Sequence, residues 1–403
     1  MFLKAIPRQS QELSLKEFLI LLKSLLTNDR YLQIFEKEMA ACLGVKKTIA
    51  FFSLRQGLFW TLKALGYKKG EEIILPAYEY FAVLSAILQA GLKPVFVDVN
   101  PSDYTIDVSK IRKAISPKTR AILVAHLNGY PAEMGRIMEI ARKNNLRVIE
   151  DSAHALGASY KKKSIGSFDI GCFSFGLGKP ISTAGGGLIA TLDQNLARKL
   201  KEKQNQFQEI SFFEKIAICL KIITARFLTF PRVFFLTSYP LLLLKKQGLV
   251  EEKINLSKKV PASYQLKYSG PQAALAREQL KNLPRRNLAR LKNAEILNQK
   301  LSGIKAIRLP IYQLHRKSAY LHYPVEIKEV DKVVRKALLA GFNLQKDYCS
   351  NLPGLLPKKR IKAFFCPVTD NLEGRVVYLP NHPSLSSRDV WEMAKKIAEI
   401  TKK

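Results

Sequence analysis

Between about residues 48 and 190, short runs of β-branched and other apolar residues alternate with longer segments of helical pattern. This alternation is typical of a mainly parallel sheet with helices on its faces. Strands are predicted at residues 48–52, 72–75, 94–99, 121–126, 146–149, 170–175 and 187–191. Helices are expected to begin near Ser53, Tyr80, Ser109 and Met134. Because ligands of such sheets bind beyond the carboxyl ends of the strands, the residues that follow each strand are the first to examine.

The sequence changes character after about residue 260. Residues 271–301 have a helical pattern with many basic residues, short strands are expected at 320–326 and 375–379, and a final helix begins at Ser387. A chain of 403 residues is long enough for more than one core. We therefore expect a large domain at residues 1–260 and a smaller C-terminal α+β domain at residues 261–403.

The five cysteines are scattered, with no C-x-x-C pair and no histidine-rich companion. This pattern indicates neither a disulfide framework nor a metal site, and it fits a reducing compartment. At the N-terminus, Lys4 and Pro7 come before any apolar stretch as long as a signal peptide. We therefore expect a cytoplasmic protein.

The formal net charge of +33 favours binding to polyanions, whether phosphorylated substrates, an acidic membrane or nucleic acid. A solvated, lysine-rich surface explains the charge equally well, because the lysines are spread along most of the chain. No homeodomain, zinc-finger or aromatic RNA-binding motif occurs in the sequence. We therefore expect no nucleic-acid partner.

Residues 211–244, SFFEKIAICLKIITARFLTFPRVFFLTSYPLLLL, are unusually apolar. Four residues interrupt the segment: Lys221, Arg226, Pro231 and Arg232. Its longest uncharged run, residues 233–244, would reach only about 18 Å as a helix against a hydrocarbon core of roughly 30 Å. We favour a hairpin that lies on the membrane surface, which would make the protein peripheral at the inner face of the membrane. A buried or dimer-contact helix pair is the second interpretation, and a membrane span is the third.

The segment VIEDSAH (residues 148–154) ends an apolar run in two carboxylates, Glu150 and Asp151. A carboxylate at the end of a buried strand needs a cationic or hydrogen-bonding partner, because leaving it alone in an apolar site costs free energy. A protonated pyridine nitrogen would be such a partner, and its charge would make the ring an electron sink. A helix N-cap or a metal ligand is the alternative explanation.

The segment SFGLGK (residues 174–179) follows another apolar strand and leads into STAGGG at 182–187. A lysine in a glycine-lined turn, Lys179, can approach a bound ring closely, and desolvation there favours the neutral amine that acts as nucleophile and base. Ser174 is placed to donate its hydroxyl to a phosphate. The alternative is a surface loop that carries one of the 66 basic residues.

The segment SLRQG (residues 53–57) opens a helix directly after a strand. The free N–H groups and the dipole of a helix N-terminus attract anions, and Arg55 adds a charged fork suited to phosphate. Helix capping by Ser53 is a competing explanation, and both can hold together.

Taken together, these segments resemble the DegT/StrS-type nucleotide-sugar aminotransferases, a group within the fold type I enzymes of pyridoxal phosphate. The resemblance covers roughly residues 34–204 and resumes from about 268 to the end. Its most specific pieces are VIEDSAHALGASY, IGSFDIGCFSFGLGK, GGGLIAT and ILPAYEYFAVLSAILQAGLKPVFVDV. It implies pyridoxal phosphate as the cofactor, and an α/β fold in which a large domain with a mainly parallel mixed sheet, flanked by helices, precedes a smaller α+β domain.

The resemblance also implies roles for the matched residues. Asp151 would pair with the pyridine nitrogen, and Lys179 would form the Schiff base with the cofactor. His154 would contact the ring hydroxyl, Tyr80 would stack on the ring, and Ser174 would help to hold the phosphate. The catalytic residues would thus be Lys179 and Asp151.

Three segments depart from the family pattern. The usual phosphate loop SGTAAL is here SLRQGL, so Arg55 and Gln56 would replace a small hydroxyl-bearing anchor in cofactor binding. The usual GEGG after the lysine is AGGG and lacks its acid. Near residues 268–272 nothing matches the asparagine that family members supply across the dimer to the phosphate. These departures leave the cofactor assignment standing but bear on the substrate.

Five further residues are weaker candidates. His126 ends a strand at the same edge of the sheet, but we expect a structural role for it. Residues in the small-domain stretches that lie near the sugar pocket in the family are Tyr320, Tyr348, Arg375 and His382.

The function implied by the resemblance is amino transfer by a homodimer. The donor would be an amino acid, glutamate by resemblance, and the acceptor a keto-sugar on a nucleotide, in polysaccharide or glycan biosynthesis. Lys179 would carry the proton between the donor and the cofactor. One alternative is a sugar dehydratase, although related dehydratases commonly have histidine in place of Lys179. Another is a non-catalytic, membrane-associated regulatory protein on the same fold, against which the retention of Asp151, Ser174 and Lys179 speaks.

Overall fold

The computed structural model describes residues 4–26, 30–244, 256, 259–311, 313, 315–357, 362–363 and 365–402. Its central sheet has eight strands in the order β1 (Lys47–Phe51), β10 (Gly187–Thr191), β9 (Ile170–Ser174), β6 (Arg147–Asp151), β5 (Thr119–Ala125), β2 (Glu72–Pro76), β4 (Lys93–Val97) and β16 (Lys362–Ala363). Strand β10 runs antiparallel to both of its neighbours, and the other pairings in this sheet are parallel. The predicted mainly parallel sheet is therefore confirmed, with all seven expected strands.

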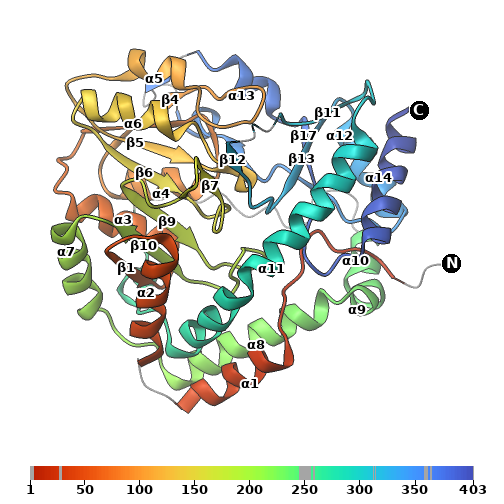
Figure 1. Cartoon of the computed structure of the whole chain (residues 1–403), viewed down its shortest axis with the longest axis horizontal. Helices are drawn as coiled ribbons and strands as arrows, with labels where there is room; N and C mark the ends of the chain where they lie inside the picture. Colours follow the sequence, from red (N-terminus) through yellow and green to blue (C-terminus); the bar gives the residue numbers. More distant parts are fainter. Residues whose placement is uncertain are drawn as a thin grey trace.

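Helices cover both faces of this sheet (Figure 1). One face packs against α3 (Leu54–Ala64), α4 (Phe81–Gln89) and α7 (Gln194–Asn205); the other packs against α2 (Arg30–Leu43), α5 (Val108–Ala114), α6 (Met134–Lys143) and the first half of α11 (Gly270–Leu301). In β2, Ile73 and Leu75 point to the first face and Ile74 to the second, because successive side chains of a strand alternate. Both faces are apolar and buried, as a parallel sheet requires.

Side-chain caps explain where several of these helices begin. Ser53 accepts the N–H of Gln56 at the start of α3, and Asp107 accepts the N–H of Ser109 at the start of α5. Each cap satisfies an N–H group that has no partner within its own helix. The four predicted helix starts lie within one residue of the observed ones.

A second, smaller core surrounds an antiparallel sheet near the C-terminus. Its strands are β11 (Ile307–Arg308), β13 (Tyr323–Ile327), β17 (Val376–Leu379) and β14 (Gln345–Lys346), in that order, and they pack with α12 (Val330–Leu339) and α14 (Ser387–Lys402). Helix α11 serves both cores, since Leu283 lies in the large one and Ala294 in the small one. The division of the chain at residue 260 therefore stays a prediction.

Short strands join the C-terminal third of the chain to the large sheet region. They form two small sheets, in which β15 (Ser350–Asn351) pairs with β3 (Tyr78–Glu79), and β12 (Arg316–Lys317) pairs with β7 (Ser159–Tyr160), itself paired with β8 (Lys163–Ser164). Helix α13 (Pro367–Leu372) follows β16. These contacts bring residues near 350 to the carboxyl end of β2.

The apolar segment forms α8 (Phe212–Leu228), α9 (Pro231–Leu236) and α10 (Ser238–Leu244), and α8 lies beside α1 (Leu15–Lys23) at one edge of the molecule (Figure 1). One side of the α1–α8 pair is buried, because Leu21 and Ile222 form an apolar cluster with Leu275 of α11. Among the described helices, none alone is long and apolar enough to cross a membrane, whereas α8 and residues 231–244 pass that test together as a pair bent by 80°. The segment is thus neither a straight span nor a fully buried helix pair.

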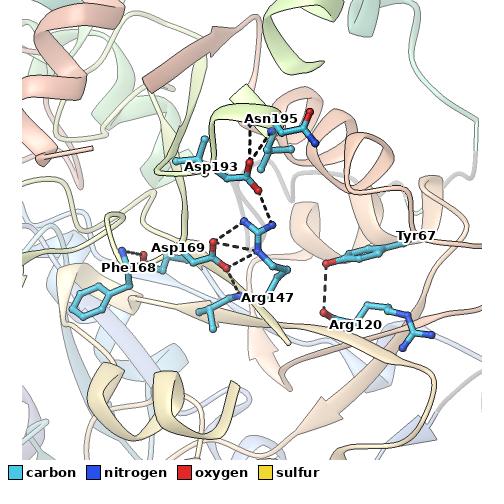
Figure 2. A network of polar contacts seen from close by, with 11 residues as sticks. Tyr67, Arg120, Arg147, Phe168, Asp169, Asp193 and Asn195 are labelled. Carbon is cyan, nitrogen blue, oxygen red and sulfur yellow. Dashed lines mark hydrogen bonds and ion pairs between the residues drawn. The ribbon is translucent and has the colours of Figure 1, made fainter. Parts of the chain in front are cut away.

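Ion pairs fix the amino ends of β6 and its neighbours (Figure 2). Arg147 makes a bidentate ion pair with Asp169, with N···O distances of 2.9 and 2.7 Å. It also contacts Asp193 at 3.1 Å. Asp193 also caps α7 by accepting the N–H of Asn195. This network ties the start of β6 to the segment before β9 and to a helix on the sheet face.

Candidate active site

A cavity of about 680 Å³ opens at the carboxyl ends of the central strands. Its walls include six of the seven residues assigned to the site from the sequence: Arg55, Tyr80, Asp151, His154, Ser174 and Lys179. A larger groove of about 870 Å³ between α12 and α14 contains none of them. The residues that could bind a ligand or take part in catalysis therefore lie where the topology of the sheet predicts a ligand.

Asp151 is the last residue of β6, and its carboxylate accepts the N–H of Ala153 at 2.9 Å. Burial raises the pKa of Asp151 above its usual value, while the Ala153 N–H and the charge of Lys179 act in the opposite direction. A protonated ring nitrogen against this carboxylate would stabilise its ionised form. The surroundings of Asp151 therefore suit the binding of a cationic group in the cavity.

Lys179 lies in a tight turn after β9, where its N–H donates to the carbonyl of Gly176 at 3.2 Å. Gly178 in this turn has φ +77°, and a Cβ there would come within 2.3 Å of Oε1 of Gln9. The Nζ atom of Lys179 donates to the hydroxyl of Tyr348 at 2.7 Å. The amine is therefore held in the cavity by a neutral hydroxyl.

His154 presents a neutral imidazole to the same cavity. Its Nδ1 accepts the N–H of Asn128 at 3.2 Å, so Nε2 carries the hydrogen and lies 3.0 Å from the hydroxyl of Tyr348. Burial, followed by the charge of Lys179, lowers the pKa of His154 well below its usual value. Burial likewise lowers the pKa of His322 to about 3. Neither ring adds positive charge near Lys179 at neutral pH.

Tyr80 supplies an aromatic face to the cavity. It occupies the N-cap position of α4, directly after β3, and its ring stacks on that of Tyr348 with the planes 19° apart and the centroids at 5.6 Å. A flat heteroaromatic ring is the kind of ligand that such a face receives.

An anion cradle forms where α3 begins. Ser53 and Arg55 line the cavity, and Nε of Arg55 is buried without a hydrogen-bond partner in the part of the chain that the structure describes. The oxygen of Ser174 lies 3.4 Å from the N–H of Gly176. At Gly187 a Cβ would come within 2.3 Å of the backbone nitrogen of Leu54, so the strand can reach this helix start only without a side chain. These donors match an oxyanion with several acceptor oxygens.

Gln56, the seventh predicted site residue, is not among the residues that line the cavity. Its amide nitrogen donates to the carbonyls of Tyr264 and Leu266 at 2.9 and 3.0 Å, and its amide oxygen accepts the N–H of Phe52 at 2.7 Å. Both polar atoms of its side chain therefore join the start of α3 to the segment before α11. The side chain of Gln56 thus supports the start of α3, and its part in cofactor binding stays a prediction.

His126 lies on the cavity wall, but both of its ring nitrogens are engaged. Its Nε2 lies 3.2 Å from a carboxylate oxygen of Glu150, and its Nδ1 accepts the N–H of Ala132 at 3.0 Å. This geometry agrees with the structural role expected for it. Among the four candidates from the small-domain stretches, Tyr348 lines the cavity; the three others lie outside its walls: Tyr320, Arg375 and His382.

Several lining residues were not singled out in the sequence, and three of them carry polar or charged side chains that matter here. Arg8 and Gln9 reach the cavity from the N-terminal segment, and Glu79 reaches it from β3. Glu79 is the one acid within the apolar stretch ILPAYEYF, which is a signal that the sequence does contain. Arg8 and Gln9 have no such signal, because only the fold brings the N-terminus to this site. No group of three or more His, Cys, Asp or Glu in the described ranges is arranged to hold a metal ion.

These residues fit pyridoxal phosphate. A lysine amine, a carboxylate, an aromatic face and an anion cradle line one cavity, and they correspond to the aldehyde, the ring nitrogen, the ring and the phosphate of that cofactor. The unpartnered Nε of Arg55 is a donor that a phosphate would satisfy. The fold and the cavity thus define a fold type I enzyme of pyridoxal phosphate.

The chain belongs to the DegT/DnrJ/EryC1/StrS aminotransferase family, whose model matches residues 9–398. It is 43% identical over 172 residues to a UDP-N-acetyl-3-dehydro-alpha-D-glucosamine 3-aminotransferase of Acidithiobacillus ferrooxidans, a match that covers 42% of this chain and 47% of the relative. It is 40% identical over 178 residues to a GDP-perosamine synthase of Caulobacter vibrioides, covering 44% and 48%. The chain thus spans about half the length of the curated relatives it matches.

Among solved structures, PseC of Helicobacter pylori, an aminotransferase of pseudoaminic acid biosynthesis, is similar over 99% of this chain and 100% of its own. The TM-score is 0.80 at 21% sequence identity, which shows a shared fold. The family and the fold class expected from the sequence are confirmed. Aminotransferases of this family depend on pyridoxal phosphate, so the expected cofactor is confirmed as well.

Proposed function

We propose that the protein is an aminotransferase that moves an amino group from an amino-acid donor, glutamate, to the keto group of a nucleotide-linked sugar in polysaccharide or glycan biosynthesis. The observation that carries this proposal is that Lys179 and Asp151 line one cavity together with an aromatic face and an anion cradle. The two curated relatives support the substrate class through their names, since one is a nucleotide-sugar 3-aminotransferase and the other a GDP-perosamine synthase.

Each group of the cofactor has a proposed partner. Lys179 would hold the aldehyde carbon and Asp151 the ring nitrogen, with Tyr80 against the ring and His154 near its hydroxyl. Ser174, together with Arg55, would hold the phosphate. When bound, the cofactor supplies a ring that accepts the electron pair released from the donor's α-carbon, and it carries the nitrogen between the two substrates.

The chain's own part in the reaction is proton transfer and charge control. The amine of Lys179, once free, would carry the proton from the donor's α-carbon to the cofactor, a transfer that a positioned base typically accelerates by about 10²–10⁴-fold. The hydroxyl of Tyr348 holds this amine, and the burial that keeps His154 neutral removes a competing cation. Asp151 keeps the proton on the ring nitrogen.

Two other functions are compatible with the fold. A sugar dehydratase would need the lysine position to be histidine, by resemblance, and this chain has Lys179 there. A non-catalytic protein would have no need to keep Lys179, Asp151 and Ser174 around one cavity. Both observations favour amino transfer.

The test is to load the purified protein with pyridoxal phosphate, supply glutamate and a series of nucleotide keto-sugars, and follow the formation of 2-oxoglutarate. We expect turnover with at least one keto-sugar, and none in Lys179→Ala. The matched control is Lys143→Ala, because that lysine makes an exposed ion pair with Glu139, which is worth little. Dehydration without 2-oxoglutarate, or full turnover by Lys179→Ala, would contradict the proposal.

We also propose that the active form is a homodimer, as the resemblance implies. In the family the partner subunit completes the phosphate site, although this chain has no match near residues 268–272 for the asparagine that does so there. Light scattering coupled to size exclusion tests this proposal. A mass of about twice that of the chain supports it, and a fully active monomer would contradict it.

We propose in addition that α1, α8, α9 and α10 dock on an anionic lipid surface. Phe213, Leu220 and Phe227 recur every seven residues on α8, and Phe213 and Phe227 are 80% and 62% exposed. On the neighbouring α1, Leu15 is 74% exposed. The exposed apolar faces of these adjacent helices form the kind of surface that lies in the headgroup region of a bilayer.

The charge of this surface favours lipid over a second copy of the chain. Residues 211–244 contain four Lys or Arg and one Glu, within a chain of net charge +33. A symmetric contact between two copies would place the same cations against each other, whereas anionic headgroups would neutralise them. An inner membrane leaflet rich in anionic lipid supplies that charge.

Co-sedimentation with vesicles tests this surface. We expect the protein to pellet with vesicles that contain phosphatidylglycerol and much less with phosphatidylcholine alone. The triple variant F213S/L220S/F227S should stay in the supernatant. The control L288S/L339S/F365S, which removes exposed apolar side chains elsewhere, should still pellet. Equal partition of the two triple variants, or a change of oligomeric state in the first one alone, would contradict lipid docking.

A further inference from the structure

Glu79 is a second carboxyl group in the wall of the active-site cavity, and no step of the proposed transfer uses it. It lies on β3, where Glu79 is paired with Ser350 of β15, and it is only 2% exposed. This pairing fixes the backbone of Glu79 between the end of β2 and the segment that carries Tyr348. A charged residue type is rarely buried to this degree without a partner.

The two oxygens of Glu79 differ. Oε1 accepts the N–H of Tyr80 at 2.6 Å, whereas Oε2 is buried and has no hydrogen-bond partner among the described residues. A buried polar atom without a partner is unfavourable by about 1–3 kcal/mol. Because Glu79 belongs to the cavity wall, a ligand in the cavity can supply the missing partner.

The surroundings of Glu79 determine its charge. Four titratable groups face it: Asp151, Lys179, Tyr348 and Cys349. Burial first, and then the charge of Asp151, raise the pKa of Glu79 well above its usual value, against the opposing effects of the Tyr80 N–H and Lys179. Two carboxyl groups in one desolvated cavity do not both ionise readily. Since Asp151 must be ionised opposite a protonated ring nitrogen, Glu79 is the carboxyl group that more readily keeps a proton.

We propose that Glu79 is a ligand-contacting acid of this site, whose protonated Oε2 donates a hydrogen bond to an acceptor oxygen of the bound ligand. This inference deepens the proposed function and rests on it. The acceptor belongs to one of three molecules that enter the cavity: the cofactor, the carboxylate of the amino donor, or a hydroxyl or carbonyl of the sugar. Their shared chemistry is an oxygen that accepts one hydrogen bond.

Two variants separate a donor from an anion at this position. Glu79→Gln keeps an N–H donor of similar shape and cannot ionise, and Glu79→Ala removes the group. Matched controls are Glu326→Gln and Glu326→Ala, because Glu326 is a half-buried carboxyl on another strand, β13, away from the cavity, and its Oε2 is paired with Arg308 at 3.6 Å. The measurements are the dissociation constant of pyridoxal phosphate, the KM of glutamate and the KM of the nucleotide keto-sugar.

We expect Glu79→Ala to weaken one of these three constants about tenfold, the size of one hydrogen bond, and Glu79→Gln to restore most of the loss. The constant that changes identifies the ligand. A second readout needs no turnover: the infrared C=O stretch of a protonated carboxyl should be present in the wild-type protein at neutral pH and reduced in Glu79→Gln. Neither Glu326 variant should change the three constants.

Three results would overturn the inference: three unchanged constants in Glu79→Ala, a loss in Glu79→Gln as large as in Glu79→Ala, or the same protonated-carboxyl band in wild type and Glu79→Gln. A wild-type protein that binds no pyridoxal phosphate would instead overturn the proposed function. The infrared result reports on Glu79 in either case, so the two failures can be distinguished.

Discussion

The two ends of strand β6 carry charged residues in opposite circumstances. At the amino end, Arg147 is paired with both Asp169 and Asp193, and each of these carboxylates makes further bonds to backbone N–H groups (Figure 2). At the carboxyl end, Asp151 accepts one backbone N–H and faces a cavity, with Glu79 nearby. Arg147, the first residue of β6, is paired with oppositely charged side chains. Asp151, its last residue, has no such ion pair among the described residues.

This difference separates stability from function. Charges that are paired inside the protein stabilise the native state, and breaking such a pair leaves a partly buried ion without a partner. Charges that are held without a partner lower stability and are retained where a ligand completes them. Substitutions at the two ends of β6 should therefore change different quantities.

The largest effect is expected at the carboxyl end, in Asp151→Asn. An amide cannot hold a ring nitrogen in its charged form, so we expect kcat/KM to fall about 10²–10³-fold, as when a group that stabilises developing charge is removed. The thermal midpoint of the cofactor-free protein should not fall, because burial already disfavours the ionised carboxyl. Steady-state kinetics and a thermal melt check both parts. Unchanged kcat/KM would contradict the role of Asp151.

The next effect is expected at the amino end, in Arg147→Met. This change leaves Asp169 and Asp193 without their cationic partner, and we expect the free energy of unfolding to fall by about 2–3 kcal/mol. Specific activity per folded molecule should stay near that of the wild type. Urea unfolding gives the first quantity, and kinetics at low temperature give the second. A large loss of activity without a loss of stability would contradict the comparison.

A smaller effect is expected in Tyr348→Phe, which keeps the ring but removes the hydroxyl that contacts both Lys179 and His154. One lost hydrogen bond to a charged or polar group corresponds to about 1–1.5 kcal/mol, so we expect kcat/KM to fall between about fivefold and tenfold. Pyridoxal phosphate should still bind. A wild-type rate would show that the hydroxyl does not position the lysine.

The smallest effect concerns stability in Glu79→Gln. The folded-state pKa of Glu79 is raised, so the wild-type protein loses stability as the pH rises from the ordinary glutamate pKa toward the raised value. The glutamine variant has no such loss, and its thermal midpoint relative to the wild type should increase with pH. Thermal melts of both proteins between acidic and alkaline pH provide the measurement. If the thermal midpoint of the variant relative to the wild type stays constant or decreases as the pH rises, the raised pKa is contradicted.

Much of this arrangement could be predicted from the sequence, because its signals are local. The alternation of apolar runs and helical segments predicted seven of the eight strands of the central sheet, and VIEDSAH and SFGLGK placed Asp151 and Lys179 at neighbouring strand ends. The position of a motif at the end of a strand can be predicted from the sequence, because parallel strands end at one edge of the sheet.

What could not be predicted depends on contacts between distant parts of the chain. Gln56 was expected in the site by its place in the phosphate loop, but its amide bonds to the carbonyls of Tyr264 and Leu266, more than 200 residues away. Arg8 enters the cavity only because the N-terminal segment folds back over the lysine turn. Likewise β16 joins the sheet from residues 362–363, far from any βα unit.

The most direct test of the central claim is to bind pyridoxal phosphate, make the lysine–cofactor linkage permanent with borohydride, and map it by peptide mass spectrometry. The account predicts the cofactor's mass on the peptide that contains Lys179, and no such mass anywhere in Lys179→Ala. A cofactor fixed to another lysine, or a protein that keeps its cofactor linkage without Lys179, would contradict it.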